Sequence, residues 1–183
     1  MLVGSRARQP WIDLPQCTNL AARGVFGPHG GRALQLHQQG YCLFRPNDPD
    51  WLALIDLVRF QLEPLVDLSE WQTGADARIR LTDAWKQQGA AAVKTLALHP
   101  ELLDLLQLCY GRKPFVFQTL NFPVGSNQAV HSDATHFHCE PEGFMCGVWI
   151  ALEDVTPEAG PLVYYPGSHR LPYVKAGDLG LAP

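Results

Sequence analysis

The sequence has no surplus of positive charge. Fourteen Lys and Arg residues stand against 18 Asp and Glu residues, so the 183-residue chain has a formal net charge of −4 at pH 7. Nucleic-acid-binding domains usually carry a basic patch, and we therefore expect no nucleic-acid partner. There is also no apolar run of roughly 20 residues, the length that a spanning helix needs, so we expect no membrane association.

The sequence also shows neither paired cysteines nor the pattern of a secretory leader. The two arginines near the N-terminus are not followed by an apolar core, so we expect no secretory signal peptide. The five cysteines are odd in number, irregularly spaced and never arranged as Cys-x-x-Cys. This usage argues against a disulfide framework or a structural zinc site, and it predicts reduced thiols in a cytoplasmic protein.

The first two thirds of the chain show helical patterns. Residues 1–36 are rich in Gly, Arg and Pro and predict an irregular lead-in, and "GYCLFR" at 40–45 predicts a short strand. Three helices are expected after it: one that begins after Asp48 and Pro49, one from about 82 to 98, and one that Pro100 opens and Gly111 closes. The first of these has apolar residues at helical spacing, namely Trp51, Leu54, Ile55, Val58 and Leu62.

From residue 113 onward the pattern is that of β-structure. Aromatic and branched residues dominate 113–125, 143–155 and the "PLVYY" segment, with turns between them. Helices that precede strands, without strand–helix alternation, favour an α+β fold. We therefore expect one domain over 37–183, with a helical part at 37–112 and β-strands at 113–175.

The segment "HSDATHFH", residues 131–138, concentrates candidate metal ligands. In an extended chain, alternate side chains point to the same side, so His131 and Asp133 are expected to project together. An imidazole and a carboxylate are two of the three ligands in the 2-His-1-carboxylate triad that binds Fe(II). A bare His-x-Asp is also common as a surface hydrogen-bonded pair, so the pattern alone leaves both interpretations open.

The sequence around this pair resembles the phytanoyl-CoA dioxygenase family of 2-oxoglutarate-dependent, non-haem iron oxygenases. The resemblance covers roughly residues 38–174 and depends on four pieces in the family's order: His131-x-Asp133, "GVWIALEDV", "EAGPL" and "PGSHR". It implies helices packed on a double-stranded β-helix, a jelly roll of the cupin type. It also implies Fe(II) as cofactor, 2-oxoglutarate and O₂ as co-substrates, and a small organic molecule as the substrate to be hydroxylated.

The resemblance also implies roles for individual residues. His131 and Asp133 would be the metal ligands and the catalytic centre, and Trp149 would line the co-substrate cavity. Asn121 and Gln118 would contact 2-oxoglutarate, although a regular strand aims only one of two residues spaced by three to the same side. Trp149 could equally be a core residue. His136 is expected on the face opposite Asp133 unless the chain has turned between them.

The sequence departs from the family in its C-terminal part. The distal histidine ligand and the arginine that binds 2-oxoglutarate are not found after His169 and Arg170, which belong to the "PGSHR" corner. The candidate strands are also fewer than the eight of a jelly roll, so we expect a roll that is incomplete on its C-terminal side. We favour a portion of a longer enzyme, with a short variant or completion by self-association or a partner chain as alternatives.

Two other classes of function stay open. One is a catalytically inactive or partner-completed oxygenase-like binding module, for which no turnover of 2-oxoglutarate is expected. The other is a metal-dependent hydrolase, because His-x-Asp with nearby histidines also suits zinc. Hydrolysis would need neither O₂ nor 2-oxoglutarate.

Overall fold

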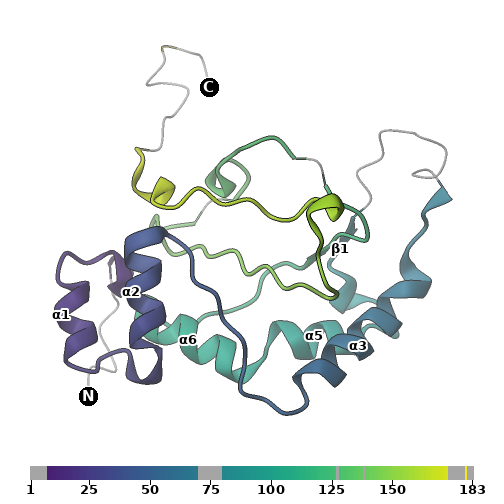
Figure 1. Cartoon of the computed structure of the whole chain (residues 1–183), viewed down its shortest axis with the longest axis horizontal. Coiled ribbons are helices and arrows are strands. Elements are labelled where there is room, and N and C mark those ends of the chain that lie inside the picture. The colour runs from purple at the N-terminus through teal and green to yellow at the C-terminus, as the bar shows by residue number, and fades with distance from the viewer. Residues whose placement is uncertain (1–7, 70–79, 127, 138, 173–179, 181–183) are drawn as a thin grey trace.

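The structure is a computed structural model of the whole chain, and it describes residues 8–69, 80–126, 128–137, 139–172 and 180. Helices occupy the first part, and mostly extended chain follows (Figure 1). The α-helices are α1 (Cys17–Ala22), α2 (Gly30–Gln39), α3 (Trp51–Leu62), α5 (Ala91–Ala97) and α6 (Pro100–Tyr110). No helix among the described residues has the length and apolar character needed to cross a membrane.

Short elements connect these helices and interrupt the extended chain. The strands are β1 (Leu81–Thr82) and β2 (Leu120–Asn121), which pair antiparallel with Leu81 opposite Asn121. The 3-10 helices are η1 (Trp11–Asp13), η2 (Gly27–His29), η3 (Glu63–Leu65), η4 (Ala84–Lys86), η5 (Asp133–Thr135), η6 (Pro157–Ala159) and η7 (Ser168–Arg170). Asp83 fastens the strand pair, because its carboxylate accepts the N–H of Thr119 and its own N–H donates to the carbonyl of Thr119.

One apolar core lies between α3 and α5. Its buried members are Ile55, Val58, Leu62, Ala84, Ala90, Ala92, Val93 and Leu96. The helix predicted after Pro49 is confirmed as α3, and Pro64 follows its end within η3, as a residue without a backbone N–H should. Ile150 and Leu152 of the later extended chain pack against the same core, so the extended part is attached to the helices here.

A second apolar core joins the N-terminal segment to α6. It contains the buried residues Ile12, Cys17, Phe26, Ala33, Leu105 and Cys109. Pro100 opens α6 and Gly111 ends it in the left-handed conformation at φ 68°, both as predicted. A side chain at Gly111 would overlap the Trp11 ring, with contacts of 2.4 to 2.8 Å, so this position combines a cap with a close approach.

Two predictions for the first half of the chain were wrong. The expected irregular lead-in at 1–36 contains α1 and most of α2 among its described residues, because their apolar side chains are buried against α6. The helix expected from about 82 to 98 is shorter and runs over Ala91–Ala97. Asp83 at φ 54° and Gly89 at φ 89° adopt left-handed backbone conformations that a continuous helix excludes. The segment "SEWQTGADARIRLTD" at 69–83, whose polar composition predicts a connector, lies mostly outside the described residues.

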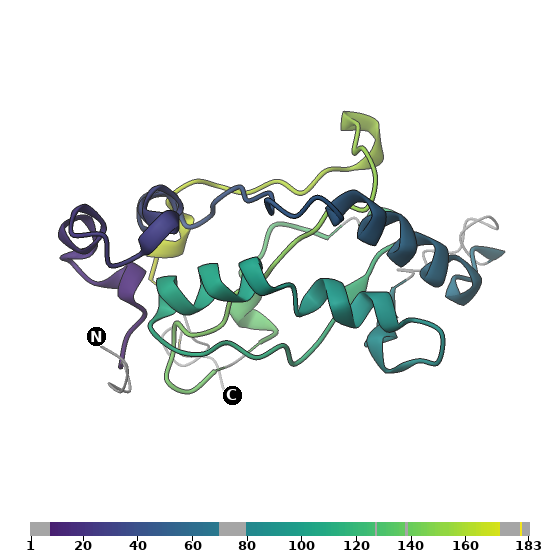
Figure 2. The same cartoon turned by 90° about the horizontal axis from the view of Figure 1, so that it is seen from below.

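The expected jelly roll is also not formed in the described part of the chain. The segments predicted as strands at 40–45, 143–155 and 161–165 have no regular strand pairing, and β2 is the only part of 113–125 that is a strand. These segments run across the helices as separate extended lengths of chain (Figure 2). A strand is stabilised by hydrogen bonds to a neighbour, and the extended segments lack one, whereas each helix forms its hydrogen bonds within itself.

The "PGSHR" corner docks on the C-terminal end of α2. The N–H of Gly167 donates to the carbonyl of Gln39 at 2.8 Å. His169 Nε2 and the Arg170 guanidinium both donate to the carbonyl of His37, with the His169 contact at 3.2 Å. Helix C-terminal carbonyls have no partner within the helix, and cationic groups are favoured there. The corner therefore acts as a helix cap supplied from far along the chain.

Candidate metal centre

The structure brings the side chains of His131 and Asp133 together. His131 Nε2 lies 3.5 Å from Asp133 Oδ1. The residue between them, Ser132, is extended at φ −98° and ψ 133°, which directs its two neighbours to the same side. The predicted juxtaposition is confirmed, but it occurs at the start of the 3-10 helix η5 and not within a strand.

A hydrogen bond fixes which nitrogen of His131 is available. Nδ1 lies 2.7 Å from the carbonyl oxygen of Ala129. Because a carbonyl only accepts hydrogen bonds, Nδ1 must carry the proton, and in the neutral ring the lone pair is on Nε2. Nε2 is the atom that faces Asp133. The 3.5 Å separation is too long for a strong hydrogen bond between the two side chains, so both retain free lone pairs.

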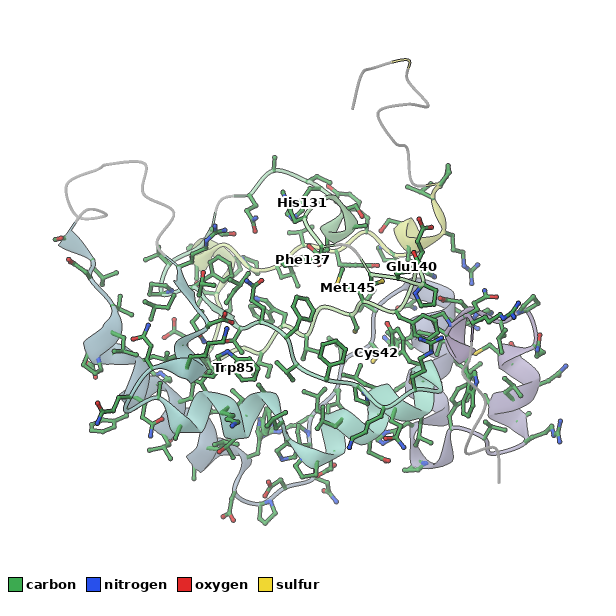
Figure 3. The ribbon with its side chains drawn as sticks, turned by 180° about the vertical axis from the view of Figure 1, so that it is seen from behind. Cys42, Trp85, His131, Phe137, Glu140 and Met145 are labelled. Atoms are coloured by element: carbon green, nitrogen blue, oxygen red, sulfur yellow. The ribbon has the colours of Figure 1, made fainter. Side chains whose placement is uncertain are left out.

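His131 lies on the side of the extended chain that faces away from the helices. Figure 3 shows His131 at the outer edge, with Phe137 and Met145 between it and the helical layer. The side chains of His131 and Asp133 are 31% and 59% exposed. The Phe137 ring meets the Phe117 ring at a centroid distance of 5.9 Å, which holds this segment against the extended chain that leads into β2.

A second extended segment approaches the carboxylate closely. A side chain on Gly147 would place its first carbon 3.3 Å from Asp133 Oδ2, tighter than most such contacts in proteins. Burial raises the pKa of the neighbouring Cys146 thiol, and the Asp133 charge raises it further, against a hydrogen bond with Tyr110 that lowers it. Without a metal ion, the Cys146 side chain is therefore a neutral thiol at neutral pH.

The other predicted site residues lie on separate segments. Asn121 is in β2 and Gln118 precedes it, both half-buried, while Trp149 is 55% exposed and so is no core residue of the described fold. The side-chain oxygen of Asn121 is buried and has no hydrogen-bond partner among the described residues. No hydrogen bond joins these three side chains to His131 or Asp133 in the part of the chain that the structure describes.

The position of His136 depends on a turn. It was expected opposite Asp133 unless the chain turned between them, and η5 makes that turn. The His136 ring lies beside the His131 ring, with centroids 5.4 Å apart and planes at 64°. Asp133 and His136 are three residues apart in the sequence. This spacing puts two side chains on the same side of a helical turn but on opposite faces of a strand, so it is compatible with the observed turn.

The residues present fit a divalent metal ion at two coordination positions. Metal bonds to nitrogen and oxygen are about 2.0–2.2 Å long, so one ion can contact two donor atoms that are 3.5 Å apart. Imidazole and carboxylate are also the ligand types of non-haem Fe(II) sites. Across the described residues, however, no three His, Cys, Asp or Glu side chains already converge closely enough to hold a metal ion.

These features define a chain in which a His-x-Asp pair of candidate metal ligands lies on extended chain over a helical layer. Residues 36–178 match the phytanoyl-CoA dioxygenase (PhyH) family, and the chain belongs to that family of 2-oxoglutarate-dependent dioxygenases. The family fold is a jelly roll, which the described residues do not clearly form; their strand pairing is limited to β1 and β2.

Individual relatives match shorter parts of the chain. Phytanoyl-CoA dioxygenase domain-containing protein 1 of Danio rerio is 46% identical over 47 residues, which are 26% of this chain and 16% of that protein. The Bos taurus protein of the same name is 44% identical over 55 residues, 30% of this chain and 18% of that protein. A probable phytanoyl-CoA dioxygenase of Caenorhabditis elegans is 36% identical over 50 residues. No solved structure matches the chain.

Proposed function

We propose that the chain contributes the metal-binding part of an Fe(II)- and 2-oxoglutarate-dependent dioxygenase that hydroxylates a small organic substrate. The observation that carries this proposal is the pairing of His131 Nε2 with Asp133 Oδ1 at 3.5 Å, with the lone pair of Nε2 directed by the Ala129 carbonyl. Iron held there would supply, with O₂ and 2-oxoglutarate, the oxidising chemistry that is characteristic of the family.

The chain's own residues have three tasks in this proposal. His131 and Asp133 bind the metal, and the Ala129 carbonyl keeps the imidazole in the tautomer that can do so. Asn121 contacts 2-oxoglutarate from β2, as the family resemblance implies; the buried atom without a partner in the described structure is its side-chain oxygen, which leaves this polar group unsatisfied by the fold. Its amide nitrogen is a hydrogen-bond donor that suits a carboxylate.

Asn121 is a better candidate for this contact than Gln118. Exposure alternates along the extended chain, where Phe115 and Phe117 point outward and Val116 is half-buried. By that alternation Asn121 follows the side of Phe117, against which the Phe137 ring packs, and Gln118 follows the side of Val116. In the same way Trp149 projects away from the core that receives Ile150 and could exclude water from the metal.

An anaerobic titration with Fe(II) and 2-oxoglutarate tests the proposal. A visible charge-transfer band is expected in the wild type and is expected to disappear in His131→Ala and Asp133→Asn. Asp154→Asn is the matched control, because it removes an exposed carboxylate elsewhere and should leave the band intact. Asn121→Ala should weaken 2-oxoglutarate binding about 10- to 150-fold while Gln118→Ala should not, since one charge-assisted hydrogen bond contributes about 1.5–3 kcal/mol.

The alternative is an oxygenase-like module that is inactive or is completed by a partner. It is favoured by the use of the Arg170 guanidinium, which binds the His37 carbonyl. It is also favoured by the exposed apolar residues Leu162, Val163 and Tyr165. No band at any 2-oxoglutarate concentration, together with undetectable succinate, would leave this alternative as the better description.

A further inference from the structure

We propose that the outward face of α3 binds the same face of a second copy of this chain, so that two α3 helices pack antiparallel about a two-fold axis. The outward face consists of Ala53, Leu57 and Phe60, continued by Pro64 of η3, and all four residues are exposed. Three features support this inference: the spacing of these residues, a hollow beside them and two charged side chains at their border. It is independent of the metal pair.

Helix α3 is apolar on two opposite faces. Ile55, Val58 and Leu62 form the inner face, which belongs to the core shared with α5. At 3.6 residues per turn, Leu57 and Phe60 point to the other side, where they are 46% and 72% exposed. A surface helix usually carries polar residues on its outer face, and a helix that is apolar all round is usually covered all round. Because α3 lies at the edge of the helical layer (Figure 1), this outer face is accessible to another molecule.

An open hollow adjoins the C-terminal end of this face. It has a volume of about 410 Å³, and Phe60, Pro64 and Leu65 are its apolar walls. Leu57 projects one turn before the hollow, and Ala53, one turn earlier still, is small enough to permit the close approach of a second helix. A face that has both a projection and a hollow can complement itself, as a two-fold symmetric interface requires.

An antiparallel pair with Leu57 opposite Phe60 of the second copy makes these contacts twice. In this register Ala53 lies opposite Pro64 of the second copy, so Leu57 of each chain approaches the hollow of the other. Two helix faces of this length bury an area at the low end for specific interfaces. We therefore expect a weak dimer, with a dissociation constant on the order of 10 μM.

The charges at the border of the face also complement themselves. Asp56 and Arg59 are both exposed and lie on the same side of the apolar face. In the stated register, Asp56 of one chain is offset by only about 3 Å along the helix axis from Arg59 of the other, and the symmetry brings the same border of both helices together. Arg59 Nη2 also lies 3.7 Å from Glu153 Oε2, but a guanidinium has five N–H donors and can bind a second carboxylate. This complementarity favours a second copy as the occupant of the face.

The first test is sedimentation equilibrium of the full chain from about 1 to 100 μM, a range that spans the expected dissociation constant. The wild type is expected to change from monomer to dimer over this range. Leu57→Glu should remain monomeric, because it would place two carboxylates inside the interface. Phe115→Glu is the matched control, since it puts the same carboxylate on an exposed aromatic position of the extended part, and it should dimerise as the wild type does. Circular dichroism should show the helix content of the wild type in both variants.

The second test uses the charged border and separates association from folding. Asp56→Lys and Arg59→Glu should each weaken the dimer about 2- to 30-fold, the effect of losing two exposed ion pairs. An equimolar mixture of the two variants should regain the affinity of the wild type. In the mixed dimer, Lys at position 56 of one chain meets Glu at position 59 of the other, and the second contact is the original Asp56–Arg59 pair.

Several results would overturn the inference. A wild type that stays monomeric throughout the range is one. Association that Phe115→Glu weakens as much as Leu57→Glu does, or that Leu57→Glu leaves intact, is another, because the contact then lies elsewhere. Two charge variants that stay monomeric when mixed would rule out the antiparallel pairing. None of these results changes the Fe(II) titration of the metal pair, so failure here and failure of the proposed function are distinguishable.

Discussion

The helical part and the extended part of this molecule differ in how their apolar residues are placed. Residues 8–69 and 80–112 contain the α-helices and supply every member of the two buried cores. The described residues from 113 to 172 contain one short strand and three 3-10 helices, and they expose large apolar side chains such as Phe115, 81% exposed, and Trp149. Figure 1 shows the two parts as a layer of helices and a set of separate extended segments.

The difference follows from where each kind of backbone finds its hydrogen bonds. A helix bonds within its own segment and needs tertiary contacts only for its apolar face. An extended segment needs a neighbour along its edge and, if apolar on both faces, a layer on each side. Ile150 and Leu152 reach the α3–α5 core on one face, and Trp149 on the other face is left exposed. The extended part thus resembles one layer of a two-layer structure.

The largest effect should separate the two parts directly. Phe26 is fully buried in the core between α6 and the N-terminal helices, and Phe26→Ala should lower the free energy of unfolding by about 3–5 kcal/mol through lost burial and a cavity. Phe115→Ala removes the same side chain from an exposed position and should change it by less than about 0.5 kcal/mol. Urea unfolding followed by circular dichroism measures both, and comparable losses would contradict the contrast drawn between the two parts.

An intermediate effect is expected where the extended part docks on α2. Gly40 has φ 82°, and a side-chain carbon there would lie 2.4 Å from His169 Nδ1 and 2.6 Å from the Tyr164 hydroxyl oxygen. Gly40→Ala should therefore cost about 2–3 kcal/mol, from left-handed strain and from overpacking. It should also make the chain near residue 165 more sensitive to proteases.

The control for that substitution is Gly24→Ala. Gly24 has a similar φ of 73° but nothing within 4 Å of the added carbon, so only the backbone strain of about 1–2 kcal/mol applies. The protease sensitivity near residue 165 should stay unchanged in this variant. If both variants open that region equally, the corner is not held by its contacts with the end of α2.

The smallest effect is a pH dependence in the helical part. His99 Nε2 lies 3.0 Å from Asp48 Oδ2, and the N–H of Asp50 donates to Asp48 Oδ1. The hydrogen bond with His99, first, and that from Asp50 lower the pKa of Asp48 in the folded protein. A lowered folded-state pKa adds stability above the ordinary Asp value of about 3.9, and this stability is lost as the pH falls through the folded value.

Asp48→Asn tests this pH dependence. At pH 7 this variant should be less stable than the wild type. The difference in stability should shrink as the pH falls below about 4, and midpoints of urea unfolding measure it. Asp56→Asn, which removes an exposed carboxylate from α3, corrects for the general loss of one negative charge. A gap between wild type and Asp48→Asn that widens on acidification would contradict the sign of the pKa shift.

Prediction from the sequence succeeded where the signal is local. The apolar spacing from Trp51 to Leu62 and the Pro100 and Gly111 boundaries act within one segment, and both helices form as predicted. The prediction of an irregular lead-in was wrong, because α1 and α2 have weak apolar patterns in the sequence and depend on burial against α6. The prediction of a strand at 143–155 was wrong for the opposite reason. Its local β-propensity is strong, but no described neighbour pairs with this segment.

The sequence by itself determined the family, the two helices with clear boundaries and the proximity of His131 to Asp133, because these depend on residues that are close along the chain. Only the tertiary structure decided that the corner around His169 caps α2, that Trp149 is exposed, and that a turn returns His136 toward His131. Those outcomes depend on contacts between distant segments or on the exact end of an extended run. The spacing of residues along the sequence predicts neither of these.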